Sequence, residues 1–525
     1  MKKYIKSSFK PVIAMLMASL ILVMSCTNDF EEINTNKNGI ATIGASELPF
    51  LFSKAQSAAP NSQWNYQVAQ NLFADQYAQY FACEATYFGS DRLVINQNWV
   101  GAQFNPMYTD VLPQLNTIFA STEPTSAEYQ LASIWWVYTF HRVTDYWGPI
   151  PYFKAGESTT GIAYDSQDKI YDDFFKRLDV AVTTLKTQTG ATPYGVSDIV
   201  YGGDVSKWIK FANSLRLRLA LRISNVNPAR AKTEAEAAVA AGVMAVSPGD
   251  DALVQRSLKG SDGNGLAIMQ WNEFRMSASM ESVLKGYEDP RMEEFFLPSA
   301  KTGSYEGLRN GLTASQLTDD GGLNSVEYNS QQGPRWSPPS ALGGNANYLA
   351  TPQNVMCTAE SFFLRAEGAL KGWAMGGTAK ELYEAGIKQS FLQWGLTDDA
   401  AAYAASLKVP IAPNDFLNSP PMTNIPVAFG ATLAIQEEQI ATQKWIALFP
   451  EGVEAWADYR RSHKLKLYPV VNSDNPLITN TATQWLRRMP FLLSETQTNK
   501  AAVEAAVPLL GGPDNTQTPL WWDKN

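Results

Sequence analysis

The chain has 525 residues with a formal net charge of −9, 18% charged residues and 12% aromatic residues. Soluble globular domains carry about 25% charged residues, so this chain has fewer charged residues than usual. It is instead rich in aromatic and amide side chains. A negative chain lacks the basic patches of nucleic-acid binders, which argues against a nucleic-acid partner. Three scattered cysteines exclude a disulfide scaffold, and two histidines far apart, His141 and His463, exclude a multi-histidine metal site.

The N-terminus has the pattern of a bacterial lipoprotein signal peptide. An apolar run from Val12 to Met24 follows the lysines at positions 2, 3, 6 and 10. That run is about half of the roughly 20 residues that span a bilayer, so it is typical of a signal peptide. It ends at Ser25-Cys26, which resembles a lipobox, where a cysteine thiol takes a diacylglycerol. We predict that residues 1–25 are removed, that Cys26 is lipidated (with palmitate among its acyl chains), and that residues 26–45 form a flexible tether.

The rest of the chain has mainly the periodicity of amphipathic helices. Asp204 occupies an N-cap position, and the apolar residues Trp208, Phe211, Leu215 and Leu219 follow it at spacings of three and four. We interpret the basic residues of this helix, Lys207, Lys210 and Arg218, as a solvated face. Further helices are predicted over residues 48–59, 64–82, 99–120, 126–141, 167–186, 230–241 and 431–449, and a close-packed pair with a glycine turn over 354–391.

Two stretches, 255–350 and 461–525, are irregular and carry many Gly, Asn, Ser and Pro residues. Long structureless loops are uncommon in compact domains unless they are functional or disordered. The first stretch is too aromatic for a disordered linker, with Trp271, Tyr305 and Trp336 among its members. We therefore expect ordered, irregular loops that rest on a helical scaffold.

Five segments occur in an order that carries a family resemblance: residues 141–152, 207–218, 289–291, 359–373 and 443–449, the last of which continues into 454–461. Together with the lipobox, they resemble the SusD/RagB-like family over essentially the whole chain. The resemblance implies a mostly α, SusD-like fold in which tetratricopeptide-like helical hairpins form a scaffold and an irregular, loop-rich half faces the ligand. Residues 46–525 are then one domain, with a helical part at 46–254, ligand-facing loops at 255–350, hairpins at 351–460 and an irregular end at 461–525.

The resemblance also implies a location and a role. Proteins of this family are outer-membrane, surface-exposed lipoproteins, here anchored at Cys26, that sit on a SusC-like TonB-dependent barrel and capture nutrient for import. They bind glycans in most studied cases and peptides in some, and they have no catalytic activity. On the family's pattern, His141 and the segments around it belong to the packed scaffold.

The sequence has none of three common catalytic or nucleotide-binding motifs, G-x-S-x-G, H-E-x-x-H and G-x-x-x-x-G-K-[ST], and so gives little support for an enzyme. Cys83 and Cys357 lie in stretches predicted as helical and are interpreted as small core residues. We predict no enzymatic activity, no catalytic residue, no metal and no cofactor. Residues 262–265 and 319–322 offer oxygens to a structural calcium ion, but plain turns explain them better.

Two loop regions combine aromatic and amide side chains, as a sugar-binding surface requires. Aromatic planes pack on the apolar face of a sugar, while amides and arginine bond its hydroxyls. In each region, a staple that pins the loop to the scaffold is the alternative role, and the sequence leaves that choice open. The candidates are Trp64, Tyr66, Tyr87, Arg92 and Asn96 in residues 61–98, and Tyr305, Tyr328, Arg335 and Trp336 in residues 305–348.

The leading hypothesis is a surface lipoprotein that captures oligosaccharide and delivers it to the SusC-like transporter. An oligopeptide is the alternative ligand, because peptides also pack on tryptophan and tyrosine. A third hypothesis is a helical-repeat adaptor that binds only proteins. The sequence does not specify the sugar, its linkage or its length, or the loops that contact the transporter.

Overall fold

A computed structural model describes residues 44–158, 161–318 and 322–524. Residues Pro49–Asn525 form one compact unit. The predicted signal peptide, Cys26 and the Asp319-Asp320 pair lie outside the described residues, as does most of the predicted tether. Within the described ranges, no helix is both long enough and apolar enough to cross a membrane.

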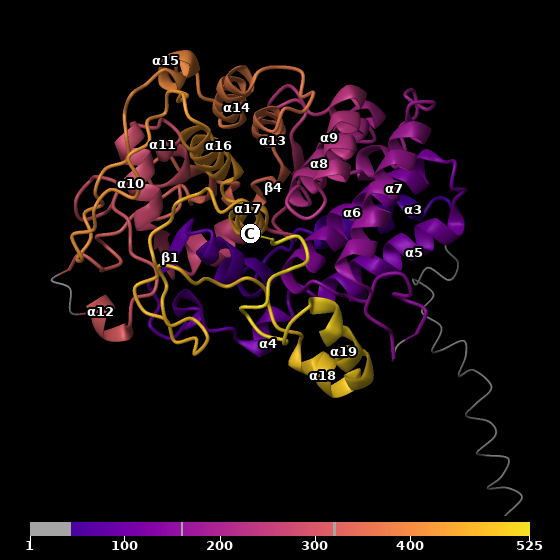
Figure 1. The fold of residues 1–525 in the computed structure, drawn as a ribbon, viewed down its shortest axis with the longest axis horizontal. Helices are drawn as coiled ribbons and strands as arrows, with labels where there is room; N and C mark the ends of the chain where they lie inside the picture. Colours follow the sequence, from indigo (N-terminus) through magenta and orange to yellow (C-terminus); the bar gives the residue numbers. More distant parts are fainter. Residues whose placement is uncertain (1–43, 159–160, 319–321, 525) are drawn as a thin grey trace, which may run out of the picture. The chain divides into compact units, whose positions relative to one another are not determined.

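The compact unit is built mainly from helices, which pack as consecutive pairs (Figure 1). The N-terminal half contains α3 (Leu48–Ala58), η1 (Gln67–Asp75), η2 (Ser90–Arg92), α4 (Gln97–Val100), η3 (Met107–Val111), α5 (Leu112–Ser121), α6 (Ala127–Trp147), α7 (Gln167–Leu185), η4 (Gly195–Ser197), α8 (Val205–Arg222) and α9 (Pro228–Ala241). Next come η5 (Asn264–Gln270), α10 (Ala278–Tyr287), α11 (Met292–Phe295), α12 (Ala314–Thr318), η6 (Pro334–Trp336) and η7 (Tyr348–Ala350). The C-terminal part contains α13 (Thr358–Leu370), α14 (Ala379–Gln393), α15 (Ala400–Ala404), α16 (Leu433–Leu448), α17 (Gly452–Ser462), α18 (Leu493–Thr498), α19 (Lys500–Ala506) and η8 (Val507–Leu510).

Several predicted helix ends are confirmed by their capping contacts. The Asp204 carboxylate accepts the backbone N–H groups of Ser206 and Lys207 at 2.9 and 3.2 Å, so α8 begins where its N-cap was expected. The helix predicted for 64–82 is shorter, because π-helical η1 ends at Asp75 and residues 81–83 pair as a strand. Helix α6 runs to Trp147 and is longer than predicted.

The predicted hairpin of residues 354–391 is present as α13 and α14, although residues 353–356 form a strand before it. The two helices approach closely because Gly386 of α14 faces Phe363 of α13. A Cβ atom on Gly386 would lie 2.8 Å from the Phe363 ring. This contact explains the small residue at that position.

Two interpretations of single residues were wrong. Arg218 does not lie on a solvated face: it is buried, and its guanidinium pairs with Glu360 of α13. The helix therefore uses a second face for an ion pair, which apolar periodicity alone does not reveal. Cys83 lies in a strand and not in a helix, and Cys357 precedes α13, although both are buried as expected.

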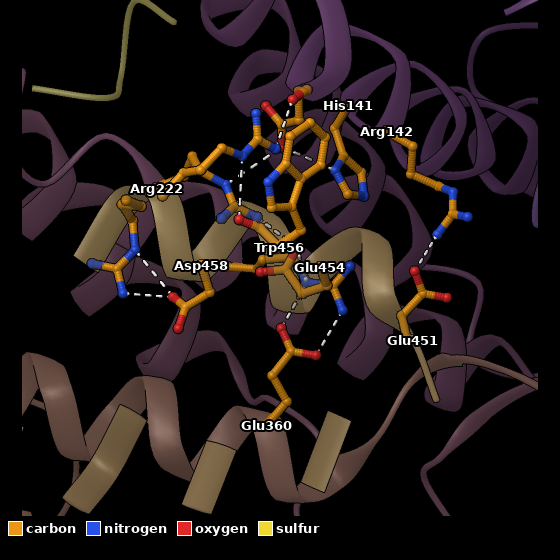
Figure 2. A network of polar contacts seen from close by, with 12 residues as sticks. His141, Arg142, Arg222, Glu360, Glu451, Glu454, Trp456 and Asp458 are labelled. Atoms are coloured by element: carbon orange, nitrogen blue, oxygen red, sulfur yellow. Dashed lines mark hydrogen bonds and ion pairs between the residues drawn. The ribbon is translucent and has the colours of Figure 1, made fainter. Parts of the chain in front are cut away.

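A network of buried charges joins the helix pairs (Figure 2). Arg222 of α8 lies 3.4 Å from Asp145 of α6 and 2.5 Å from Glu454 of α17. His141 packs 3.6 Å from Asp145, and burial lowers its pKa to about 4, so the imidazole is neutral at pH 7. These ion pairs connect α6, α8 and α17 within the scaffold, and loss of one partner would leave a buried charge uncompensated.

Two short antiparallel ribbons bring distant segments together. Strands β1 (Phe81–Cys83) and β3 (Phe274–Met276) pair with Cys83 opposite Phe274. Strands β2 (Ala252–Val254) and β4 (Gln353–Met356) pair with a register shift near Ala252. The first ribbon places the loop after residue 83 beside the loop before residue 274, and this juxtaposition creates the candidate site.

Candidate ligand-binding site

The carboxylate of Glu273 joins residues from two distant loops, and exposed aromatic side chains stand on both of these loops. The Tyr87 hydroxyl donates a hydrogen bond to Glu273, and Gln67 Nε2 donates to the other carboxylate oxygen at 2.6 Å. Trp271 precedes Glu273 by two residues, and the carbonyl of Trp64 accepts the backbone N–H of Gln67. The aromatic side chains are 61% (Trp64), 69% (Tyr87) and 39% (Trp271) exposed. We call these five residues the Glu273 cluster.

The Glu273 cluster rests on a rigid base. The backbone N–H of Glu84 donates to the Glu273 carbonyl at 2.9 Å, which extends the β1–β3 ladder by one residue. Beneath Tyr87, Phe88 stacks on Phe274 with ring centroids 6.1 Å apart. Because Phe88 and Phe274 are buried, Tyr87, which packs on Phe88, is held on a packed support and loses little freedom when a ligand binds.

A cleft of about 300 Å³ borders the cluster. Asn272, whose backbone is left-handed with φ of 59°, accepts the amide of Gln331 with its side-chain oxygen. Arg275 forms the floor, where it donates to the carbonyl of Val326 at 3.0 Å and to Asn272 Oδ1 at 2.9 Å. The cleft is lined by Asn272, Arg275, Leu297, Pro298, Ala300, Val326, Glu327, Asn329 and Gln331.

The chemistry of this surface suits a neutral polar ligand with flat apolar faces. Partial burial raises the pKa of Glu273, while the hydrogen bond from Gln67 opposes that shift. Aromatic rings supply stacking area at low entropy cost, and the neighbouring amides and carboxylate supply donors and acceptors in fixed positions.

The comparisons with known proteins identify the family. A family model described as Susd and RagB outer membrane lipoprotein matches residues 31–523. This chain belongs to the SusD/RagB family. Comparison with curated proteins found no match.

Solved structures of SusD homologues share the fold. A chitin-binding SusD homologue from Flavobacterium johnsoniae is 38% identical, with a TM-score of 0.82 over 91% of this chain and 99% of its own. A SusD homologue from Bacteroides uniformis is 33% identical, with a TM-score of 0.82 over 91% and 99%. A third, from Bacteroides thetaiotaomicron, is 29% identical, with a TM-score of 0.80 over the same shares. The mostly helical SusD-like fold is thereby confirmed, and the SusD/RagB family is one of binding lipoproteins of the outer membrane and not of enzymes.

Within this SusD-like fold, the predicted site residues fall into separate groups. Trp64 and Tyr87 belong to the Glu273 cluster. Tyr66, Arg335 and Trp336 line a different cavity, of about 310 Å³. Trp336 is only 3% exposed, because it packs against Trp394 and Phe449.

The remaining predicted residues hold loops in place. Arg92 Nε lies 2.6 Å from Asp474, and the Asn96 side chain accepts a backbone N–H at the start of α4. Tyr328 is buried and accepts a hydrogen bond from Asn414. Tyr305 is half-buried, and this burial raises its pKa to about 12. These contacts fit the staple role that the sequence left open, and their part in ligand binding stays a prediction.

Gln67 lies in the candidate region 61–98, whereas Trp271 and Glu273 lie outside both regions that the sequence predicted. Trp271 stands between Gln270 and Asn272, an aromatic flanked by amides, which is the pattern used for the other candidates. Glu273 carried no local signal, because its partners Gln67 and Tyr87 lie about 200 residues away in the chain.

Among the described residues, no group of three or more His, Cys, Asp or Glu side chains is placed to hold a metal ion. Asp262 is buried and accepts the backbone N–H groups of Asn264 and Gly265 at 2.9 and 3.3 Å, as expected for a turn.

Proposed function

We propose that this SusD-family lipoprotein captures oligosaccharide on the Glu273 cluster. The observation that carries the proposal is the exposure of Trp64, Tyr87 and Trp271 on the two loops that Glu273 joins, beside an amide-lined cleft. Tryptophan and tyrosine exposed to this extent on a packed support form a binding surface and are not core residues.

Chitin-type oligosaccharides, built of N-acetylglucosamine, are the first ligand to test. Two solved relatives, 38% and 26% identical to this chain, are described as chitin-binding. Their description supports a glycan over the alternative, an oligopeptide. The sugar of this chain is a separate question, because a few loop residues can change specificity on a shared fold.

We propose the transport setting from the family. The bound oligosaccharide passes to a SusC-like TonB-dependent barrel, and the protein is held at the cell surface by lipid on Cys26. Mass spectrometry of the mature protein tests the anchor, with a diacylated N-terminal Cys26 as the expected result. Co-purification of a barrel protein in detergent tests the partner.

Ligand binding is tested by calorimetry on the unlipidated chain with a panel of oligosaccharides and oligopeptides. The variants Tyr87→Ala and Trp271→Ala should each weaken oligosaccharide binding about tenfold or more. Phe50→Ala serves as the matched control, because Phe50 is an equally exposed aromatic on α3, far from β1 in the fold (Figure 1). Trp336 is unsuitable for this test, since its removal would open a hole in the core.

The outcomes separate the hypotheses. Binding of peptides and of no sugar would replace the glycan by the oligopeptide. Binding of neither, together with co-purification of the barrel, would favour a protein adaptor without a small ligand.

A further inference from the structure

A second cavity, of about 310 Å³, lies apart from the Glu273 cluster. Helix η5 separates the two: Asn264 at its start lines the cavity, while Trp271 follows its end and belongs to the cluster. The cavity reaches solvent beside Asn347 and Pro352, which line it and are exposed. Its volume is at the lower end of the roughly 300–1,000 Å³ of small-molecule sites.

One wall of the cavity is aromatic. Trp336 and Trp394 pack with ring centroids 5.8 Å apart, and Phe449 lies behind both. The Arg335 guanidinium stacks 4.0 Å from the Trp394 ring, and its nearest carboxylate, that of Glu294, is 3.8 Å away. An arginine held flat on a tryptophan at a cavity wall keeps donors available for a ligand's oxygen atoms.

Other lining groups have hydrogen-bonding capacity that the protein does not use. Among the described residues, both amide atoms of Asn354, Oε1 of Gln393 and Nε1 of Trp394 have no hydrogen-bond partner. Buried polar groups in proteins nearly always have a hydrogen-bond partner, so such a concentration calls for a ligand or water to complete it. These atoms are covered in the structure, although the residues that carry them line the cavity.

The acidic lining residues are already engaged, which argues for a neutral ligand. Glu451 pairs with Arg142 at 2.7 Å. Asp251 accepts the hydroxyl of Ser247 at 2.6 Å and the backbone N–H of Thr358 at 2.7 Å. Asp262, the third acidic lining residue, accepts the backbone N–H groups of Asn264 and Gly265. All three carboxylates are therefore already hydrogen-bonded within the protein.

We infer that this cavity is a second glycan subsite that holds a single neutral sugar ring. A ring of the aromatic wall takes the apolar face of the sugar, and Arg335, together with the Asn354 and Gln393 amides once they turn to the ligand, bonds its hydroxyls. The choice of a sugar rests on the proposed function, whereas the existence of a small-ligand site rests on the cavity alone.

The test compares cavity variants with cluster variants. Asn354→Leu keeps the side-chain size and removes an amide that has no partner in the protein, so folding should be preserved. Ala350→Phe acts differently, because it places a phenyl ring on the cavity wall and so reduces the space for a ligand. Binding of the monosaccharides N-acetylglucosamine, glucose, galactose and mannose is measured by saturation-transfer NMR, and crystals of the wild-type chain are soaked with the same sugars.

We expect one monosaccharide to bind the wild-type chain. Its affinity should fall about tenfold or more in both cavity variants and should be unchanged in Tyr87→Ala. Equal binding by wild type and both cavity variants would overturn the inference, as would a soaked crystal with the sugar elsewhere. If oligosaccharides bind through Tyr87 and no monosaccharide binds, the subsite fails and the proposed function stands. If the monosaccharide occupies the cavity while no oligosaccharide binds the cluster, the subsite stands and the proposed function fails.

Discussion

Arg218 of α8 binds Glu360 of α13 through two parallel hydrogen bonds, each 2.6 Å long, in a region where both side chains are buried. The pair joins two helix hairpins that are about 140 residues apart in the chain. Glu454 of α17 lies 3.5 Å from the same guanidinium, so one arginine links three helices.

Arg218→Met should destabilise the protein by about 3–5 kcal/mol, because it leaves two buried carboxylates with one charge partner fewer. Urea unfolding followed by circular dichroism measures this loss. Lys176→Ala, at an exposed position on α7, serves as the control and should change stability by less than about 0.5 kcal/mol. A loss as small as that of the control would mean that the pair contributes little.

Gly386→Ala should destabilise the α13–α14 hairpin, although alanine is the better helix former by about 1 kcal/mol. The added methyl group would meet the Phe363 ring at 2.8 Å, and overpacking of this kind costs about 1–3 kcal/mol. Thermal unfolding should show a lower midpoint than wild type. A higher midpoint would show that the two helices separate without cost.

Tyr87 offers a way to separate stacking from hydrogen bonding at the Glu273 cluster. Tyr87→Phe keeps the ring and loses only the hydroxyl that donates to Glu273, so oligosaccharide affinity should fall by less than about threefold. Tyr87→Ala loses the ring as well, so its oligosaccharide affinity should fall about tenfold or more. Calorimetry with the same oligosaccharide compares the two, and equal losses would assign the effect to the hydroxyl.

Asp75 should make stability depend on pH. It is buried beneath Tyr66, which donates to it at 2.7 Å, and burial raises its pKa to about 7. In the unfolded chain the carboxyl pKa is near 3.9. Between about pH 3.9 and pH 7, the folded protein therefore keeps a proton on Asp75 that the unfolded chain has released. The free energy of unfolding therefore falls, through this group, as the pH rises from about 3.9 toward 7.

Asp75→Asn removes this titration. Its side chain still accepts from Gln70, and Tyr66 can donate to Asn264, which is 3.2 Å from its hydroxyl. Between about pH 5 and pH 8, wild type should lose on the order of 2 kcal/mol more unfolding free energy than the variant. Urea unfolding at both pH values tests this, with exposed Asp398→Asn as the control that should behave like wild type.

Local features could be predicted well from the sequence. The N-cap at Asp204 and the hairpin near residues 358–393 depend on neighbouring residues, and both are present. The order of the family segments was sufficient to place the chain among the SusD/RagB proteins. Where a distant segment supplies the partner, prediction failed: the Arg218 position was interpreted as solvated because Glu360 is far away in the chain.

The sequence by itself determined the family and the helical scaffold, because periodicity, caps and glycine turns act over a few residues. Only the tertiary structure decided which aromatics face solvent. The sequence left open whether Trp336 contacts ligand or pins its loop, and it is buried by Trp394 and Phe449, whereas Trp271, two residues before Glu273, stays exposed. Exposure is a property of the segments packed around a side chain, and here those segments meet through β1–β3 pairing and core packing across hundreds of residues.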